Sequence, residues 1–214
     1  MSERVLVRQM ELGPMQNFVY LLGDPKTREA AVIDPAWDVA KILAQARQDE
    51  LTIKHLIVTH NHFDHINGIA TLLEQTDAMV HAHRDDAEEL AVEVAPSSMH
   101  LVGGGEIVKV GQVPVTLVHT PGHTPGSQCV HVHDRLLTGD TLFIRACGRT
   151  DLPGGDPAEL YRSLATLKKM DDHTYVLPGH NYADQPTSTL AQEKRENPFL
   201  QFQALEEFLR MVHV

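Results

Sequence analysis

The sequence is poor in cysteine, with only Cys129 and Cys147 among its 214 residues. Two cysteines make no disulfide framework, so we expect reduced thiols and a cytoplasmic protein. The first ten residues, "MSERVLVRQM", have no long apolar core and no small-residue cleavage site, so we expect no secretory signal peptide. No apolar run approaches the roughly 20 residues of a membrane span. We therefore predict no membrane partner.

Basic residues are also scarce, with 18 Lys and Arg against 29 Asp and Glu, which gives a formal net charge of -11. Proteins that bind nucleic acid usually present a basic face, so we predict no nucleic-acid partner. The chain has no low-complexity segment, no linker-like stretch and no short repeat. We expect residues 1–214 to form a single domain, which is long enough to bury a substantial core.

Strand-like and helical segments alternate along the chain in two rounds. In each round several strands precede a helix, and a histidine-bearing loop follows a buried strand. The segments with strand-like patterns are 5–10, 17–24, 30–36, 53–60, 79–83, 106–110, 115–120, 128–133, 135–140 and 174–180. This order predicts a layered α/β sandwich with a site along one edge of its sheets.

The helical segments carry sequence signals of their own. Apolar spacing predicts a helix over 38–48, another through 69–73 after the histidine loop, and helical structure over 84–91. For a later helix we predict Asp156 as the N-cap, Pro157 in the first turn, and Glu159 closing a capping box. The dipeptide at 197–198 is predicted to start a last helix, whose apolar side is Phe199, Phe202 and Leu205.

The segment "THNHFDH" places four potential metal ligands within six residues: His60, His62, Asp64 and His65. The chain has 14 histidines, so chance clustering has to be weighed. His60 and His62 project to one side of an extended segment, and Asp64 and His65 lie where the chain enters the next helix. Imidazole and carboxylate together suit zinc, iron or manganese. Four ligands exceed what one open tetrahedral site needs, so the grouping suggests two metal ions.

Three other positions have the same context, a strand end followed by a turn. His123 lies between two Pro-Gly turns in "HTPGHTPGS", Asp140 ends a strand in "LLTGDTLF", and His180 does so in "YVLPGHNY". A rigid sheet presents ligands well at such positions. We therefore count these three residues as candidates that complete the site.

Together, "THNHFDH", "HTPGHTPGS", "TGDTLF" and "LPGHNY" resemble the motifs of the metallo-β-lactamase fold superfamily. The resemblance covers nearly the whole chain and implies an α/β fold with four layers, an αββα sandwich. It implies that one metal ion binds His60, His62 and His123. It implies that the other binds Asp64, His65 and His180. Asp140 would bridge the two ions.

In that arrangement two divalent ions, Zn or Fe with Mn as a further option, lie about 3.5 Å apart and share a hydroxide. Metal binding lowers the pKa of water towards neutrality, so no serine or cysteine nucleophile is needed. Asp64 would orient the attacking hydroxide, and we predict it as the catalytic residue.

Two relatives within the superfamily compete. The motifs "GHNY" and "RENPF" resemble glyoxalase II, the hydroxyacylglutathione hydrolases, and "GRTDLPGGD" resembles short bacterial proteins of that type. This resemblance implies hydrolysis of a thioester or ester. The motif "CGRTD" instead resembles the persulfide dioxygenases, which convert glutathione persulfide to sulfite with one iron. In that alternative the iron would bind His60, His123 and Asp140.

Arg149 and Tyr182 are the candidate substrate-binding residues. Tyr182 matches a tyrosine that holds glutathione in glyoxalase II, whereas Arg149 and Asp151 stand where that family usually has lysine and tyrosine. A guanidinium at 149 suits a substrate carboxylate; the alternative is a surface arginine paired with Asp151. We expect a small-molecule substrate, either a glutathione or another thiol derivative, and the sequence leaves the oligomeric state open.

Other classes fit the sequence less well. A true β-lactamase is usually exported, and a nuclease of this fold is expected to be more basic. A non-catalytic metal-binding scaffold usually loses ligands, and all seven ligand positions are filled here. The sequence therefore favours a metallo-hydrolase.

Overall fold

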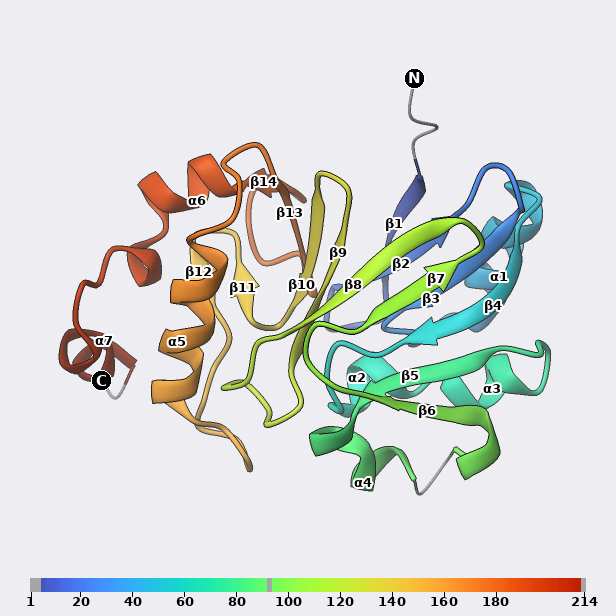
Figure 1. Ribbon diagram of the computed structural model, residues 1–214, viewed down its shortest axis with the longest axis horizontal. Helices are drawn as coiled ribbons and strands as arrows, with labels where there is room; N and C mark the ends of the chain where they lie inside the picture. The colour runs from blue at the N-terminus through green and yellow to red at the C-terminus, as the bar shows by residue number, and fades with distance from the viewer. Residues whose placement is uncertain (1–4, 92–93, 213–214) are drawn as a thin grey trace.

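The computed structural model describes residues 5–91 and 94–212, which form four layers in the order helices, sheet, sheet, helices (Figure 1). Three clusters of buried apolar side chains separate these layers: one between each sheet and its helices, and one between the two sheets. This is the αββα sandwich that the sequence motifs implied.

The first sheet has six strands in the order β1-β2-β3-β4-β5-β6. Its strands are β1 Leu6–Leu12, β2 Asn17–Gly23, β3 Glu29–Ile33, β4 Thr52–Ile57, β5 Met79–His83 and β6 Met99–Val102. The first three strands pair antiparallel, and β3 to β6 pair parallel. Because parallel strands end at the same edge, the chain segments after β3, β4 and β5 emerge side by side.

Four helices and two 3₁₀ turns accompany this sheet. They are α1 Val39–Gln48, α2 Phe63–Ile66, α3 Ile69–Leu73, the 3₁₀ turn Arg84–Asp86, α4 Ala87–Leu90 and the 3₁₀ turn Pro96–Ser98. The Asp38 side chain accepts a hydrogen bond from the Lys41 amide at 3.0 Å, which caps α1. Buried Val39, Ile42 and Ala46 of α1 pack on the outer face of the sheet. The predicted helix over 38–48 is thus confirmed.

The second sheet has six strands in the order β14-β13-β10-β9-β8-β7. Its strands are β7 Ile107–Val110, β8 Val113–His119, β9 Gln128–Val132, β10 Arg135–Gly139, β13 Tyr175–Pro178 and β14 Ser188–Thr189. A two-stranded ribbon, β11 Leu142–Phe143 and β12 Ala146–Cys147, follows β10. Strands β10 and β13 are parallel, so the segments after them also leave at one edge.

Three helices and a 3₁₀ turn cover the outer face of the second sheet (Figure 1). They are α5 Pro157–Leu167, α6 Leu190–Glu196, the 3₁₀ turn Pro198–Leu200 and α7 Leu205–Val212. Leu160, Leu164 and Leu167 form the buried side of α5, as predicted.

The helix predicted through 69–73 is confirmed as α3, although the short helix α2 before it was not predicted. Two other helix predictions need correction. The capping box at Asp156 does not close. Its carboxylate caps the amides of residues 158 and 159, but its own amide donates to the Gly122 carbonyl at 2.8 Å instead of to the Glu159 side chain.

The last helix was also placed wrongly. Residues 198–200 form only a 3₁₀ turn, capped by the Asn197 side chain, and the last helix begins at Leu205. Its buried residue is Phe208, against which the rings of Phe199 and Phe202 pack at 6.3 and 5.9 Å. The apolar spacing correctly indicates that Phe199 and Phe202 pack on the protein, but these residues belong to a turn and to the segment after it, not to a helix. Helix α6 was not predicted.

Within the described residues, 5–91 and 94–212, no helix is both long and apolar enough to cross a membrane.

Candidate metal centre

The segment after β4 carries the four clustered ligands. His60 is 1% exposed and follows the buried end of β4, His62 is the N-cap of α2, and Asp64 and His65 lie within α2. The carboxylate of buried Asp34 accepts hydrogen bonds from the Thr59 amide and hydroxyl, both at 2.7 Å. These bonds fix the chain where it leaves the sheet, so the ligands start from a rigid strand end.

The other three ligands come from the second sheet, at the same edge of the sandwich. His123 lies between β8 and β9, Asp140 directly follows β10, and His180 follows β13. Gly179 permits this crowding, because a Cβ there would lie 2.3 Å from the Asp140 Oδ1. The structure thus brings all seven predicted ligands together across the two sheets.

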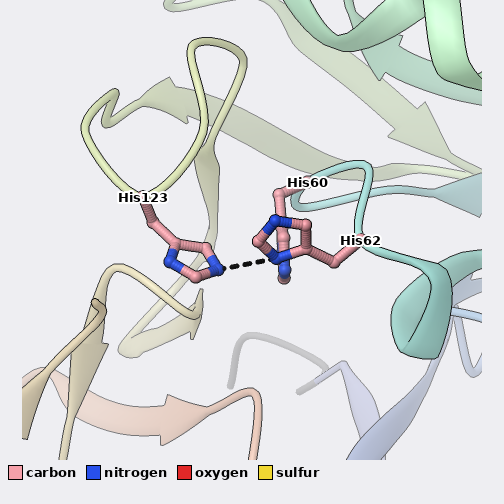
Figure 2. Close-up of side chains that lie close together, drawn as sticks. All are labelled: His60, His62 and His123. Carbon is pink, nitrogen blue, oxygen red and sulfur yellow. Dashed lines mark hydrogen bonds between the residues drawn. The ribbon is translucent and has the colours of Figure 1, made fainter. Parts of the chain in front are cut away.

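The first half-site consists of His60, His62 and His123, whose donor nitrogens lie within 4.8 Å of one another. Figure 2 shows the three rings turned towards one another, with His62 Nδ1 and His123 Nε2 joined at 2.9 Å. His123 Nδ1 faces the Arg149 carbonyl oxygen at 2.8 Å, which fixes the orientation of its ring. This is the ligand group that the superfamily motifs implied for one metal ion.

The second half-site consists of Asp64, His65 and His180, which form another group within 4.8 Å. The Nε2 atoms of His65 and His180 lie 3.1 Å apart. Asp64 Oδ2 lies 3.5 Å from His65 Nε2 and 3.4 Å from His180 Nε2. These residues form the other implied ligand group.

Asp140 lies between the half-sites. One carboxylate oxygen is 3.5 Å from His65 Nε2, and the other is 3.6 Å from His123 Nε2 and 3.4 Å from His180 Nε2. Burial alone would raise the pKa of this carboxyl, but the imidazoles of His65 and His180 hold it below its usual range. An ionised carboxylate in contact with both groups is placed as a bridging ligand would be.

The hydrogen bonds around the second half-site show why these residues fit a metal ion. His65 Nδ1 faces Asp34 Oδ2 at 3.0 Å, and His180 Nδ1 faces the Met15 carbonyl oxygen at 2.9 Å. Both oxygens act as acceptors, so each Nδ1 carries a proton and each ring points its Nε2 at the other. Metal-binding histidines are held in this way by an acceptor on the second nitrogen.

Two orphaned atoms support the same conclusion. Within the described part of the chain, His60 Nε2 and Asp140 Oδ1 are buried without a hydrogen-bond partner. Unpaired buried polar atoms are costly, at roughly 1–3 kcal/mol each. A cation bound by these atoms would remove that cost.

The two half-sites differ in their proton affinity. In the first, burial and then the neighbouring His123 lower the pKa of His62 to about 4, and burial lowers the pKa of His60 well below its usual value. In the second, burial opposes protonation, yet the carboxylates of Asp140 and Asp34 raise the pKa of His65 to about 9. His60 and His62 are therefore neutral at pH 7, whereas His65 holds a second proton when no metal is bound.

Sequence reasoning missed two residues that support these ligands. Asp34 orients His65, and Asn17 donates from Nδ2 to Asp64 Oδ2 at 2.8 Å while accepting from Trp37 Nε1, also at 2.8 Å. Asp34 ends a strand in "VIDPA", the same context as Asp140, so that signal was available. Asn17 opens β2, and nothing local in the sequence marks it.

The structure places Tyr182 at the mouth of the centre. Its ring is stacked on His180 at 4.6 Å and lies 5.4 Å from Phe143, and the residue is 58% exposed. Partial burial and then the charge of Asp140 raise the pKa of Tyr182 to about 12. Its hydroxyl is therefore protonated at pH 7 and able to donate a hydrogen bond.

The structure places Arg149 differently from Tyr182. Its backbone carbonyl holds His123, but its side chain is 62% exposed and pairs with Asp151 through two bonds of 2.6 and 2.7 Å. This is the surface pair that the sequence left open as the alternative. Arg149, Asp151, Cys147 and Phe199 nevertheless line an open cavity of about 550 Å³. The cavity adjoins His123 through the Arg149 backbone.

Cys147 lies in this cavity, but burial raises the pKa of its thiol to about 12. Such a thiol remains protonated at neutral pH and is a poor nucleophile. Its position therefore gives no support to a cysteine mechanism.

Residues 12–180 match the family profile described as the metallo-beta-lactamase superfamily. The chain belongs to this superfamily. It is therefore a metal-binding relative of metal-dependent hydrolases. This confirms the resemblance drawn from the four motifs.

Two proteins with similar sequences have names that describe different activities. A probable metallo-hydrolase of Bacillus subtilis, YqgX, is 33% identical over 90% of this chain and 96% of its own length. The mitochondrial persulfide dioxygenase ETHE1 of Mus musculus is 32% identical over 97% of this chain and 80% of its own length. The relatives thus include both a probable metallo-hydrolase and a persulfide dioxygenase.

Solved structures confirm the fold. ETHE1 from Myxococcus xanthus is 36% identical, with a TM-score of 0.88 over 97% of this chain and 90% of that one. TTHA1623 in a di-iron-bound form is 32% identical, with a TM-score of 0.76 over 90% of this chain and 100% of that one. TTHA1623 is thus matched over its whole length, and its structure contains two iron ions.

Proposed function

We propose that this protein is a dinuclear metallo-hydrolase that cleaves a thioester or an ester. The observation that carries the proposal is the placement of the Asp140 carboxylate, 3.4–3.6 Å from donor nitrogens of both half-sites. Two ligand groups joined by one carboxylate suit two divalent ions. The di-iron-bound neighbour supports the same count.

The donor set is imidazole and carboxylate without thiolate, which suits zinc, iron or manganese. Ions bound there would supply Lewis acidity and would make water ionise near neutral pH. The rest of the chemistry falls to the side chains of the chain itself.

We assign to Asp64 the role of accepting a proton from the attacking water. Asn17 Nδ2 holds its Oδ2 at 2.8 Å, and the carboxylate has a side-chain exposure of 13%, so it is reachable from the mouth of the centre. In this role Asp64 Oδ2 orients the attacking water and accepts its proton. The oxygen of water bonds to the acyl carbon, the C–S or C–O bond breaks, and the thiol or alcohol leaves with a proton.

The mouth of the centre supports a small substrate with a polar, acidic end. The Tyr182 hydroxyl donates a hydrogen bond, and Arg149 pairs with a substrate carboxylate after releasing Asp151. A glutathione thioester or another carboxylated thiol derivative has this character. A cytoplasmic location and the absence of nucleic-acid and membrane partners are part of the same proposal.

A persulfide dioxygenase is the second candidate. The specific observation in its favour is the likeness to the ETHE1 proteins, together with the "CGRTD" segment that lines the cavity. In that function one iron would be held by His60, His123 and Asp140. The second half-site would then remain without metal.

The test is a parallel assay of one preparation purified under anaerobic conditions. We expect about two metal ions per chain, cleavage of S-lactoylglutathione or a simpler thioester, and no oxygen uptake on glutathione persulfide. One iron per chain with oxygen uptake and no thioester or ester cleavage would replace this proposal with the dioxygenase.

A matched control is needed for the ligand variants. His173→Ala removes an exposed histidine that precedes β13, whereas His180 follows the other end of that strand. It should keep the metal content and turnover of the wild-type protein. His180→Ala should lose the ion of the second half-site, and with it the hydrolysis.

A further inference from the structure

Asp86 is a buried carboxylate that the proposed chemistry does not use. It is 1% exposed and ends the 3₁₀ turn after β5. It occupies the N-cap position of α4, yet its side chain makes no capping hydrogen bond to that helix. An aspartate at an N-cap normally satisfies a helix amide. The side chain of Asp86 is therefore engaged elsewhere.

The Asp86 carboxylate accepts three hydrogen bonds from two loops. Oδ2 accepts from the Asn61 amide at 3.1 Å and from the Thr124 hydroxyl at 2.7 Å. Oδ1 accepts from the Gly126 amide at 2.6 Å. Asn61 stands between His60 and His62 in sequence, and Thr124 follows His123. One carboxylate thus joins the two loops that supply the whole first half-site.

These loops come from different sheets, so local chain geometry does not set their distance. The contact is also close, because a Cβ at Gly126 would lie 2.5 Å from the Asp86 Cγ. Hydrogen bonds to an ionised, buried acceptor are about twice as strong as neutral ones. The carboxylate therefore has the strength and the position to hold the loops in register.

We propose that Asp86 is a positioning residue that sets the metal affinity of the first half-site. It keeps His123 within reach of His62, whose donor nitrogens are 2.9 Å apart. Asp86 bonds to no residue of the second half-site, so the affinity of that half-site is independent of it. The inference rests on the proposed dinuclear function only in needing metal at this centre.

Asp34 provides the internal comparison. It bonds directly to the ligand His65 and to Thr59, which precedes His60. Asp86 instead bonds to Asn61, Thr124 and Gly126, none of which is a ligand, and so acts through the loops. A defect confined to the first half-site is therefore specific to Asp86.

The experiment measures Co²⁺ binding by metal-free protein in two backgrounds. His180→Ala disables the second half-site and leaves the first, and His62→Ala does the reverse. In the His180→Ala background, Asp86→Asn should weaken Co²⁺ binding by about 10–100-fold, which is typical for the loss of an outer hydrogen-bond partner. In the His62→Ala background the same substitution should change it by less than about threefold, within the spread seen at independent sites. The visible spectrum of bound Co²⁺ should change only in the first background.

Two further variants separate positioning from general loss of structure. Thr124→Val deletes one of the three bonds at constant size and should give a smaller loss in the same background. Glu88→Gln changes an exposed carboxylate on the adjacent helix α4 and should have no effect. Thermal unfolding of each variant shows that the fold is retained.

The outcomes are distinct. Unchanged affinity of Asp86→Asn in the His180→Ala background, or equal losses in both backgrounds, overturns the role of Asp86. Failure of the wild-type protein to bind two ions counts against the proposed dinuclear function instead. A single ion that still depends on Asp86 leaves the positioning role intact while favouring the dioxygenase.

Discussion

The two half-sites of the metal centre both use imidazole ligands but are built differently. The first has three imidazoles, of which His60 has an orphaned Nε2 and His62 a pKa lowered to about 4 by burial and His123. The second has two imidazoles surrounded by carboxylates, and the pKa of His65 is raised to about 9 despite its burial. His60 and His62 can bind a cation without losing a proton, whereas His65 must exchange a proton for one.

The difference shows that the residue type of a ligand does not determine its pKa. Both half-sites combine imidazoles from the segment after β4 with one from the second sheet, but the second also has Asp34 and Asp64 beside its rings. Neighbouring negative charge stabilises the protonated imidazole, and burial without such charge stabilises the neutral one. The predictions below probe this contrast, beginning with the residue that belongs to both half-sites.

The largest effect is expected for Asp140→Ala, because this carboxylate contacts donor nitrogens of both half-sites. We expect both ions to be lost and hydrolysis to fall by about a thousandfold or more, since each 1.4 kcal/mol of lost transition-state stabilisation costs a factor of ten. Metal analysis and thioester assay of the same sample measure this. A variant that keeps two ions would show that Asp140 is not a bridging ligand.

Removing one ligand from each half-site in turn tests the difference between the half-sites directly. For a dinuclear hydrolase, His180→Ala and His62→Ala should each leave about one ion per chain and each cut hydrolysis by about a hundredfold or more. If the protein is instead a dioxygenase with iron on His60, His123 and Asp140, His180→Ala keeps the iron. The metal content of each variant relative to the wild-type protein therefore separates the functions. It falls from two ions to one in the hydrolase and stays at one iron in the dioxygenase, because neither His62 nor His180 holds that iron.

Asp34→Asn should act most strongly on the second half-site. Its carboxylate accepts from His65 Nδ1 at 3.0 Å, and loss of such a partner costs about 10–100-fold in metal affinity. Affinity measured with Co²⁺ in the His62→Ala background reports this half-site alone. An equal loss for Asp34→Asn and for the control His173→Ala would contradict the assignment.

The half-sites should also differ in their response to pH. Because the pKa of His65 is raised to about 9, the metal-free second half-site holds a proton at pH 7 that a metal ion must displace. Its affinity should rise about tenfold per pH unit between 7 and 9 and level off above that. The first half-site should change little over the same range, because the pKa of His62 lies near 4. Proton release measured by calorimetry in buffers of different ionisation enthalpy checks the sign.

The smallest effect is expected at the mouth of the cavity. Arg149→Ala should raise KM by about tenfold for an acidic thioester and leave the metal content unchanged, because it removes the charge-assisted bond to the substrate carboxylate but no metal ligand. Arg149→Lys should restore only part of the loss, since a point charge cannot reproduce the planar guanidinium.

Asp151→Asn is the complementary change, because it frees the guanidinium from the pair seen in the structure. It should lower KM for the same substrate. Unaltered KM in both Arg149→Ala and Asp151→Asn would identify the pair as an ordinary surface contact. Substrate selectivity would then have to come from the region around Tyr182.

The sequence alone predicted the layers, most strand and helix positions, and the seven candidate ligands. Period-two and helical patterns report burial directly, so elements such as β2 and α1 were recognised from their apolar spacing. The ligands were recognised because metal chemistry restricts residue type, and because the four motifs place each of them at a strand end. Local signals were sufficient wherever the physical requirement was itself local.

Tertiary structure decided the rest, because those features depend on residues far apart in the chain. The capping box at Asp156 failed because Gly122 supplied a better partner for its amide, and the last helix shifted because Phe199 and Phe202 pack on Phe208 from outside it. The raised pKa of His65 needs Asp34 from 31 positions away, and the first half-site needs loops from two sheets. Contacts between residues far apart in the chain form only when the chain folds. The sequence therefore identified the ligands, and the fold determined the pKa values and the geometry of each half-site.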